Sequence, residues 1–224
     1  MDCLLPAART GYALRGPIRG ARHGADTILH DVITLASASP RRSQLLDQIG
    51  VRHGVRPADI DESGRPGETP AAYVRRVAEE KARVGWAVDA SRPVLAADTA
   101  VALGPELFGK PVDLKDGLRM LAALSGRTHE VLTAVAVRSS AGLECAVSIS
   151  EVTFRELTPA EQRRYSETGE PMGKAGGYAI QGLAAAFIAG LRGSYSGVMG
   201  LPLAETATLL GRAGVRMWNT EESA

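Results

Sequence analysis

The segment VITLASASPRRSQLL, residues 32–46, places Ser37, Ser39, Arg41 and Arg42 where a short apolar strand is expected to run into a helix. With Ser39 as N-cap and a proline at the first helical position, both arginines fall in the first turn. Cations there oppose the helix macrodipole, at a cost of roughly 0.3 to 1 kcal/mol each, unless an anion is bound. Free backbone N–H groups at a helix start favour such an anion. The segment therefore predicts a polyphosphate site, with two solvated surface arginines as the alternative.

Asp98 is an acid within an otherwise apolar run, PVLAADTAVAL, at residues 93–103. A run of this kind is typical of a strand that is covered on both faces. A carboxylate buried there must be paired, hydrogen-bonded or metal-bound, because burying it alone costs several kcal/mol. Acids at such positions are functional more often than surface acids are. Asp98 is therefore a candidate catalytic residue, acting on water directly or as a metal ligand.

Two lysines are further candidates. A helix is expected to start at Thr69 with proline at its first position, and Lys81 continues the helical spacing of its core-facing side chains. Either the Lys81 stem lets its ammonium reach water, or the cation points into a cleft. Lys110 lies in a short return strand expected at 107–111, which would place it near the same end of the sheet as Asp98.

These residues together suit one kind of chemistry. The chain offers four cations and three acids around two turns rich in small residues: Arg41, Arg42, Lys81, Lys110, Asp61, Glu62 and Asp98. It lacks a Ser-His-Asp elbow, CxxC or HExxH metal motifs, a GxGxxG fingerprint and a GxxxxGK[ST] loop. Cations with a few carboxylates fit a phosphorylated substrate whose charge is shared with a divalent metal.

The remaining elements must position these groups. Asp113 is the expected N-cap of a helix whose buried stripe is Leu114, Leu118, Leu121 and Leu124. Two strands are expected at 129–137 and 145–154, then a helix from the capping box at Thr158, a glycine-rich segment at 170–182, strands at 183–188 and 198–201, and a last helix at 202–210. Interleaved helices and strands predict a layered α/β protein.

Composition narrows the class of protein. The 224 residues carry a net charge of +1, so no overall field favours nucleic acid or an anionic membrane, and 4% aromatic residues leave little for base stacking. The longest apolar run, 183–191, is far below the ~20 residues that a membrane span needs. Two cysteines, Cys3 and Cys145, cannot form a disulfide framework, which favours a reducing, cytoplasmic location.

The domain boundaries follow from periodicity. Residues 1–31 scatter arginines among Gly, Ala and Pro without an apolar pattern, and they are expected to be a disordered extension. One domain is expected at 32–212, followed by a C-terminal tail at 213–224.

Seven motifs, in order, resemble those of the Maf nucleotide pyrophosphatases, also called septum-formation inhibitor proteins. They are LASASPRR, EEKA, LAADTAV, GKP, LSGRTHEVLTAVAV, KAGGYAIQG and GSYSGVMGLPLAET. The resemblance covers residues 33–210. It implies an elongated mixed sheet flanked by helices, in two lobes with a central cleft, similar in outline to inosine triphosphate pyrophosphatases and commonly in a homodimer.

The resemblance also implies an activity. Proteins of this family hydrolyse nucleoside triphosphates to the monophosphate and pyrophosphate with a divalent cation, Mg²⁺ or Mn²⁺. The acid in the position of Asp98 is the general base, and here it is expected to bind the metal together with Glu62. The expected phosphate ligands are Ser37, Ser39, Arg41, Arg42, Lys81 and Lys110.

Three positions distinguish the branches of the family, and here they hold Arg41, Thr99 and Gln181. This set resembles the branch that acts on dTTP and UTP, whereas a 7-methyl-GTP branch tends to carry Trp, Gln and Glu. A Gln amide can donate to and accept from the O4/N3 edge of uracil or thymine. The sequence thus predicts a dTTP/UTP pyrophosphatase that removes non-canonical nucleotides. The alternative is a nucleotide-binding regulator of cell division with little turnover.

Overall fold

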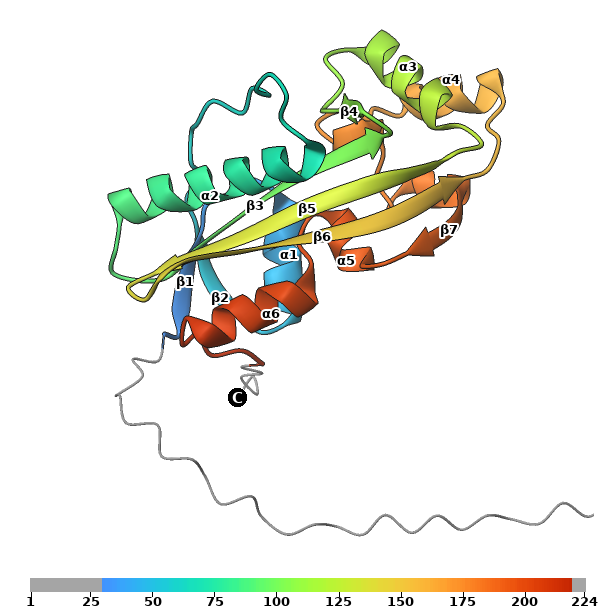
Figure 1. Ribbon diagram of the computed structural model, residues 1–224. Coiled ribbons are helices and arrows are strands. Elements are labelled where there is room, and N and C mark those ends of the chain that lie inside the picture. Colours follow the sequence, from blue (N-terminus) through green and yellow to red (C-terminus); the bar gives the residue numbers. More distant parts are fainter. Residues whose placement is uncertain (1–29, 219–224) are drawn as a thin grey trace, which may run out of the picture.

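The fold is built on one mixed β-sheet. The computed structural model describes residues 30–218, and the sheet there has seven strands in the order β2-β1-β3-β5-β6-β7, with β4 paired to β3. The strands are β1 (Val32–Leu35), β2 (Arg52–Val55), β3 (Val94–Leu103), β4 (Glu106–Phe108), β5 (Thr128–Ser139), β6 (Gly142–Phe154) and β7 (Ile188–Arg192). Strand β1 pairs in parallel with β2 and β3, and the remaining pairs are antiparallel. The predicted elongated α/β architecture is confirmed (Figure 1).

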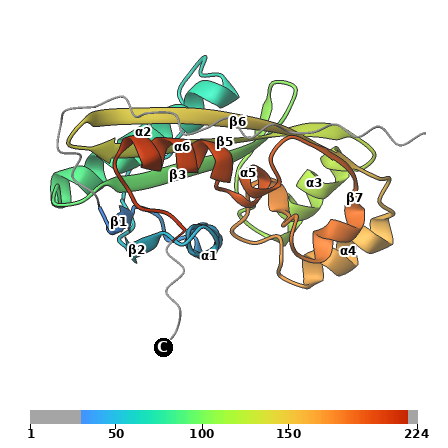
Figure 2. The same ribbon diagram turned by 90° about the horizontal axis from the view of Figure 1, so that it is seen from below.

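The helices cover the two ends of the sheet differently. They are α1 (Pro40–Gln48), α2 (Pro70–Val88), α3 (Leu114–Leu124), α4 (Pro159–Glu167), α5 (Tyr195–Met199) and α6 (Leu203–Arg212), with 3-10 segments η1 (Ala175–Gly177) and η2 (Leu183–Phe187). At one end α2 lies on one face of the sheet and α1 and α6 lie on the other (Figures 1 and 2). At the far end α3 and α4 lie beside β4 and β7, which gives the molecule two lobes.

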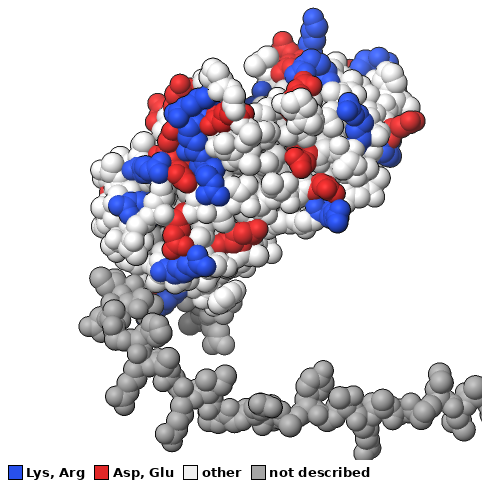
Figure 3. Space-filling model, viewed as in Figure 1, with Lys and Arg blue, Asp and Glu red and all other residues white. Residues whose placement is uncertain are grey.

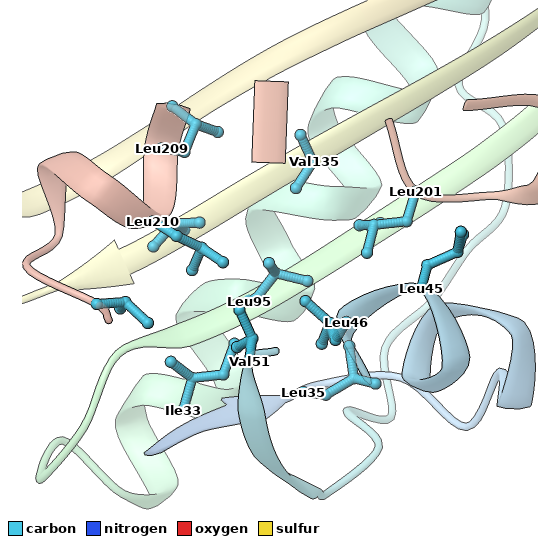
Figure 4. Close-up of a cluster of buried hydrophobic side chains, with 13 residues drawn as sticks. Ile33, Leu35, Leu45, Leu46, Val51, Leu95, Val135, Leu201, Leu209 and Leu210 are labelled. Atoms are coloured by element: carbon cyan, nitrogen blue, oxygen red, sulfur yellow. The ribbon is translucent and has the colours of Figure 1, made fainter. Parts of the chain in front are cut away.

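The two faces of strand β3 pack against different parts of the hydrophobic core. Its even-numbered residues Ala96, Ala100 and Ala102 pack in one cluster with α2 side chains. The odd-numbered Leu95 packs in a second cluster with α1 and α6, and Val101 in a third with the far lobe. The cluster that contains Leu95 is shown in Figure 4. The predicted coverage of this strand on both faces is therefore confirmed, and Asp98 and Thr99 must point to opposite faces.

One edge of β3 is interrupted. Strand β1 reaches only Val94 and Leu95 of β3, and β4 pairs with it only from Val101 onward. Residues 96–100 of β3 therefore have no strand partner on this edge within the described part of the chain. Asp98 and Thr99 lie in the middle of this gap.

Most predicted helix starts are confirmed. The side chains of Thr69, Asp113 and Thr158 each accept a bond from the backbone N–H three residues later, and the capping box at Thr158 is complete. Ser39 is the N-cap of α1 and Pro40 its first residue, but the Ser39 side chain makes no capping bond.

Three expectations were wrong. The predicted strand at 183–188 is η2 followed by β7, and the predicted strand at 198–201 is the end of α5 and its left-handed glycine cap. Both were short apolar runs, for which periodicity cannot separate strand from helix. In α3, Leu114 is 52% exposed, because the buried face is formed by Gly117, Met120, Leu121 and Leu124.

The two ends of the described chain contact each other outside the expected domain limits. His30 forms a parallel bridge with Val215, and Trp218 donates a backbone bond to Ile49. Apart from His30 and Asp31, the expected extension at 1–31 lies outside the described residues, as do the last six residues of the tail. Between residues 30 and 218, no helix has the length and apolar character that a membrane crossing requires.

Candidate functional site

Every residue expected to handle phosphate, proton or metal lines one cavity. This cavity is lined among others by Ser37, Ser39, Arg41, Arg42, Glu62, Lys81, Asp98 and Lys110. We call it the phosphate pocket. The turn between β1 and α1 supplies the serines, the start of α1 supplies the arginines, α2 supplies Lys81, and β3 supplies Asp98. In space-filling form the molecule is hollowed between the lobe with α2 and the lobe with α3 (Figure 3).

Lys81 bridges two carboxylates inside this pocket. Its Nζ lies 2.9 Å from Asp98 Oδ1 and 2.8 Å from Glu62 Oε1, and its side chain is 9% exposed. The helical spacing that places Val77 and Ala78 in the core also directs Lys81 inward. The alternative in which Lys81 reaches out to bulk water is therefore wrong.

The two carboxylates have opposite pKa shifts. Burial raises the pKa of Asp98, although the charges of Lys81 and Arg42 oppose the shift. For Glu62, burial also acts upward, but the hydrogen bond and charge of Lys81 and the charge of Lys110 outweigh it, so its pKa is lowered. Glu62 therefore stays ionised while Asp98 is the better proton acceptor near neutral pH.

Asp98 and Glu62 are the residues here that could hold a divalent cation. Both carboxylates contact Lys81 Nζ and so lie close together, whereas the neighbouring Asp61 accepts the backbone N–H of Ser63. In residues 30–218 no group of three or more His, Cys, Asp or Glu side chains could hold a metal alone. Mg²⁺ is commonly held by one or two carboxylates plus substrate phosphates, which matches this arrangement.

Arg42 is bonded to protein rather than solvated. Its Nε donates to Gly200 O at 2.8 Å, its Nη1 to Ser37 Oγ at 2.9 Å and its Nη2 to Thr99 Oγ1 at 3.3 Å. Burial lowers its pKa, with Asp98 acting in the opposite direction. The alternative of a solvated surface arginine is therefore wrong for Arg42, which ties the start of α1 to β3 and to the end of α5.

Arg42 also fixes the direction of the Ser37 hydroxyl. Ser37 Oγ accepts from Arg42 and from the backbone N–H of Ser39, at 2.9 and 3.2 Å. A hydroxyl has one proton and two lone pairs, so both acceptor positions of Ser37 are filled and its proton is available. Ser37 thus presents a donor in the phosphate pocket.

The three positions expected to set specificity line a second, adjoining cavity. Arg41, Thr99 and Gln181 lie around this space, which we call the base pocket. The two pockets share Arg41, Lys110 and Gly173. Arg41 Nε donates to Met199 O at 3.4 Å, and partial burial lowers the Arg41 pKa.

The wall of the base pocket is a loop closed by Glu170. Its carboxylate accepts the Tyr165 hydroxyl at 3.0 Å and the backbone N–H groups of Leu183 and Ala184 at 2.9 and 3.1 Å. A Cβ added at Gly182 would collide with this carboxylate, which would have to shift and give up its bonds. The bonds of Glu170 to Leu183 and Ala184 thus join the two ends of the loop that carries Gln181.

Sequence reasoning missed Glu170 and two further residues beneath the pocket. His129 and Tyr178 form a buried 2.8 Å bond between Nε2 and the phenol oxygen, and Tyr178 lines the base pocket. Burial lowers the pKa of His129 to about 4. Glycine density at 170–182 marked the loop, but no local pattern identifies an acid whose partners lie 13 residues onward.

Comparison with known proteins identifies the family of the chain. The chain is 58% identical to the dTTP/UTP pyrophosphatase of Anaeromyxobacter sp. (strain Fw109-5), over 81% of this chain and 89% of that protein. It is 52% identical to the dTTP/UTP pyrophosphatase of Cupriavidus pinatubonensis, over 84% of this chain and all of that protein. Among solved structures, the Staphylococcus aureus Ham1 protein matches 57% of this chain and 72% of its own, at 16% identity and a TM-score of 0.41. Residues 32–213 match the family described as Maf-like protein, and the chain belongs to that family.

Proposed function

We propose that the protein hydrolyses dTTP and UTP to the nucleoside monophosphate and pyrophosphate. The observation that carries the proposal is the pair of adjoining pockets, one with Asp98, Lys81 and Ser37 and the other with Thr99 and Gln181. When the triphosphate group of a nucleotide occupies the phosphate pocket, its base reaches the base pocket. Two relatives more than 50% identical over most of their length are dTTP/UTP pyrophosphatases, which supports the same activity.

The phosphate pocket supplies the electrostatic part of the reaction. Lys81, Lys110 and Arg41 bring positive charge to the triphosphate, and Ser37 donates its free proton. Ser39 and Arg42 complete the phosphate site, Arg42 by holding Ser37 in place. Preorganised donors of this kind stabilise charge that develops on the leaving pyrophosphate without reorganising during the reaction.

Asp98 supplies the base. A water molecule attacks the α-phosphorus of the nucleotide. Its oxygen forms a bond to that phosphorus, and the bond from the α-phosphorus to the pyrophosphate oxygen breaks. The proton of the water passes to Asp98, whose Oδ1 is bonded to Lys81, so that Oδ2 is the oxygen available to accept it. The raised pKa of Asp98 makes it a stronger base than an ordinary carboxylate.

A divalent cation, Mg²⁺ or Mn²⁺, belongs to this proposal. Asp98 and Glu62 would hold it together with substrate oxygens. When bound, such a cation neutralises charge on the triphosphate. The chemistry of the two convergent carboxylates supports its binding there.

The base pocket supplies recognition. Gln181 has an amide that can donate to the O4 group of uracil or thymine, and Arg41 and Thr99 line the same pocket. The proposal extends to a homodimer in the cytoplasm that removes non-canonical nucleotides, which the family resemblance supports.

The test is a panel of nucleoside triphosphates, incubated with the purified protein and Mg²⁺ or Mn²⁺ while pyrophosphate release is followed. We expect kcat/KM for dTTP and UTP to exceed that for purine triphosphates, CTP and 7-methyl-GTP by tenfold or more. Equal values across the panel would remove the specificity and leave a general pyrophosphatase. Release of inorganic phosphate without pyrophosphate would contradict the reaction itself.

A further inference from the structure

Two threonine hydroxyls link the base pocket to the protein interior. Thr99 of β3 lies directly opposite Thr133 of β5 in the sheet, and their Oγ1 atoms are 3.0 Å apart. Thr133 is completely buried, whereas Thr99 lines the base pocket. Beyond Thr133, the carbonyl oxygen of Gly197 in α5 lies 2.8 Å from Thr133 Oγ1.

The direction of the protons along this chain follows from the donors and acceptors. A carbonyl oxygen can only accept, so Thr133 donates its single hydroxyl proton to Gly197 O. The bond between the two threonines must then use the proton of Thr99. Thr99 also accepts from Arg42 Nη2, at 3.3 Å.

This arrangement leaves the Thr99 hydroxyl able to make only one kind of hydrogen bond with a ligand in the base pocket. Its proton is committed to Thr133 and one of its two lone pairs is committed to Arg42. The remaining lone pair can only accept a hydrogen bond. Thr99 therefore offers an acceptor, and no donor, to a ligand in the base pocket.

A hydroxyl that can only accept a hydrogen bond distinguishes pyrimidines by whether N3 carries a proton. Uracil and thymine carry a proton on N3, whereas N3 of cytosine is itself an acceptor. Gln181 is exposed, and its amide can turn to present either its oxygen or its nitrogen, so it can meet a 4-keto or a 4-amino group equally well. The acceptor of Thr99 cannot be reversed in this way.

We propose that Thr133 is a positioning residue that fixes Thr99 as an acceptor, and that this selects bases with a proton on N3. The inference rests on the proposed pyrophosphatase activity and names the contact that rejects cytosine. Removing the Thr133 hydroxyl frees the Thr99 proton, so that Thr99 can donate to cytosine N3 as well as accept from uracil N3–H.

The test compares UTP with CTP, which share a ribose and differ only on the 4-position and N3. We measure kcat and KM for both in the wild type, Thr133→Val, Thr133→Ala and Thr133→Ser. The UTP/CTP ratio of kcat/KM should fall about tenfold in the valine and alanine variants, chiefly through KM for CTP. The serine variant keeps the hydroxyl and should keep the ratio.

Two controls separate this role from a structural one. Thr206 is also a fully buried threonine, but its Oγ1 has no partner among the described residues, so Thr206→Val should leave the ratio unchanged. In a Thr99→Val background, Thr133→Val should add no further change, because its effect passes through Thr99.

An unchanged UTP/CTP ratio in either folded Thr133 variant that lacks the hydroxyl would overturn the inference. A ratio that falls equally in Thr133→Ser would also overturn it, since the hydroxyl would then not matter. Absence of pyrophosphate release from every substrate in the wild type is a different result, which would refute the proposed function itself.

Discussion

The Lys81 ammonium lies 2.9 Å from the Asp98 carboxylate, although the two residues come from a helix and a strand on different layers of the fold. Each satisfies the other in a place where neither charge could be buried alone. The same ammonium also contacts Glu62, so the pair can open toward a ligand without leaving Lys81 unpartnered. This relationship makes the two residues the first targets for mutation.

Replacing Lys81 with Ala should lower kcat/KM by about 100-fold, because a charge that stabilises the transition state is lost. Ala is the strongest helix former, so α2 should persist. The neighbouring Arg83→Ala removes an exposed cation that pairs with Glu79, and such pairs contribute little. Steady-state kinetics of the two variants should therefore differ, and equal activity would mean that the Lys81 charge is not used.

Replacing Asp98 with Asn should reduce kcat by a factor of about 10² to 10⁴, the usual contribution of a general base. Because burial raises the Asp98 pKa, the acidic limb of the wild-type rate profile should lie above the pH at which an ordinary carboxylate titrates. In Lys81→Ala that limb should move to still higher pH, since a charge that lowers the Asp98 pKa is gone. Asp61→Asn is the control, and a folded Asp98→Asn variant with wild-type turnover would refute the assignment.

Glu170→Gln should raise KM for UTP several-fold while changing kcat less. The amide loses an acceptor that holds the ends of the base-pocket loop, at a cost of about 1 to 3 kcal/mol for a partner left unsatisfied. Glu161 is a matched acid in the same lobe, where it accepts from Thr158 and Arg155. Glu161→Gln should lower the melting temperature without changing KM. An equal rise of KM in both variants would show that Glu170 only supports the lobe.

Acidification should destabilise the fold through His129. Its pKa is about 4 when folded, because of burial, against an ordinary value of about 6.5. The unfolded chain thus binds more protons between these values, so stability falls as the pH drops through this range. From pH 7 to pH 5 the loss from this group is about 2 kcal/mol.

Denaturant unfolding of wild type and His129→Gln at the two pH values measures this loss. The variant should show a smaller decrease, and Tyr178→Phe, which removes the partner but keeps the imidazole, should retain most of it. Identical pH dependence in wild type and His129→Gln would contradict the shift.

Local signals were sufficient for much of this structure. A capping box at Thr158 and a Thr-Pro start at Thr69 are read within a few residues, and Asp98 stood out because it interrupts a buried strand. Arg41 and Arg42 show the limit. They are adjacent and alike in sequence, yet Arg42 bonds Gly200, Ser37 and Thr99, whereas Arg41 makes a single longer bond to Met199 O. Nothing local distinguishes the two.

The same limit explains the misread segments. The apolar residues that begin at Leu183 and at Val198 form a 3-10 segment and a short helix because Glu170 and Ser194 accept bonds from their backbone N–H groups or those next to them. The bonds to Glu170 span 13 and 14 residues and depend on how the loop folds back, whereas the Ser194 cap lies only three residues from Gly197. The roles of Glu170 and Thr133 have the same origin, and they become visible only with the fold.

Asp98 and Thr99 are consecutive, yet they serve the two pockets from opposite faces of β3 at the gap in the sheet. The alternation of side chains along β3 therefore places a residue of the base pocket next to a residue of the phosphate pocket. Substitutions of residues on the Thr99 face can therefore change which nucleobase is preferred while leaving Asp98 in place. Inserting or deleting a single residue upstream in this strand would invert both faces at once. Diversification at this site is thus open to changes of side chain and closed to changes of length.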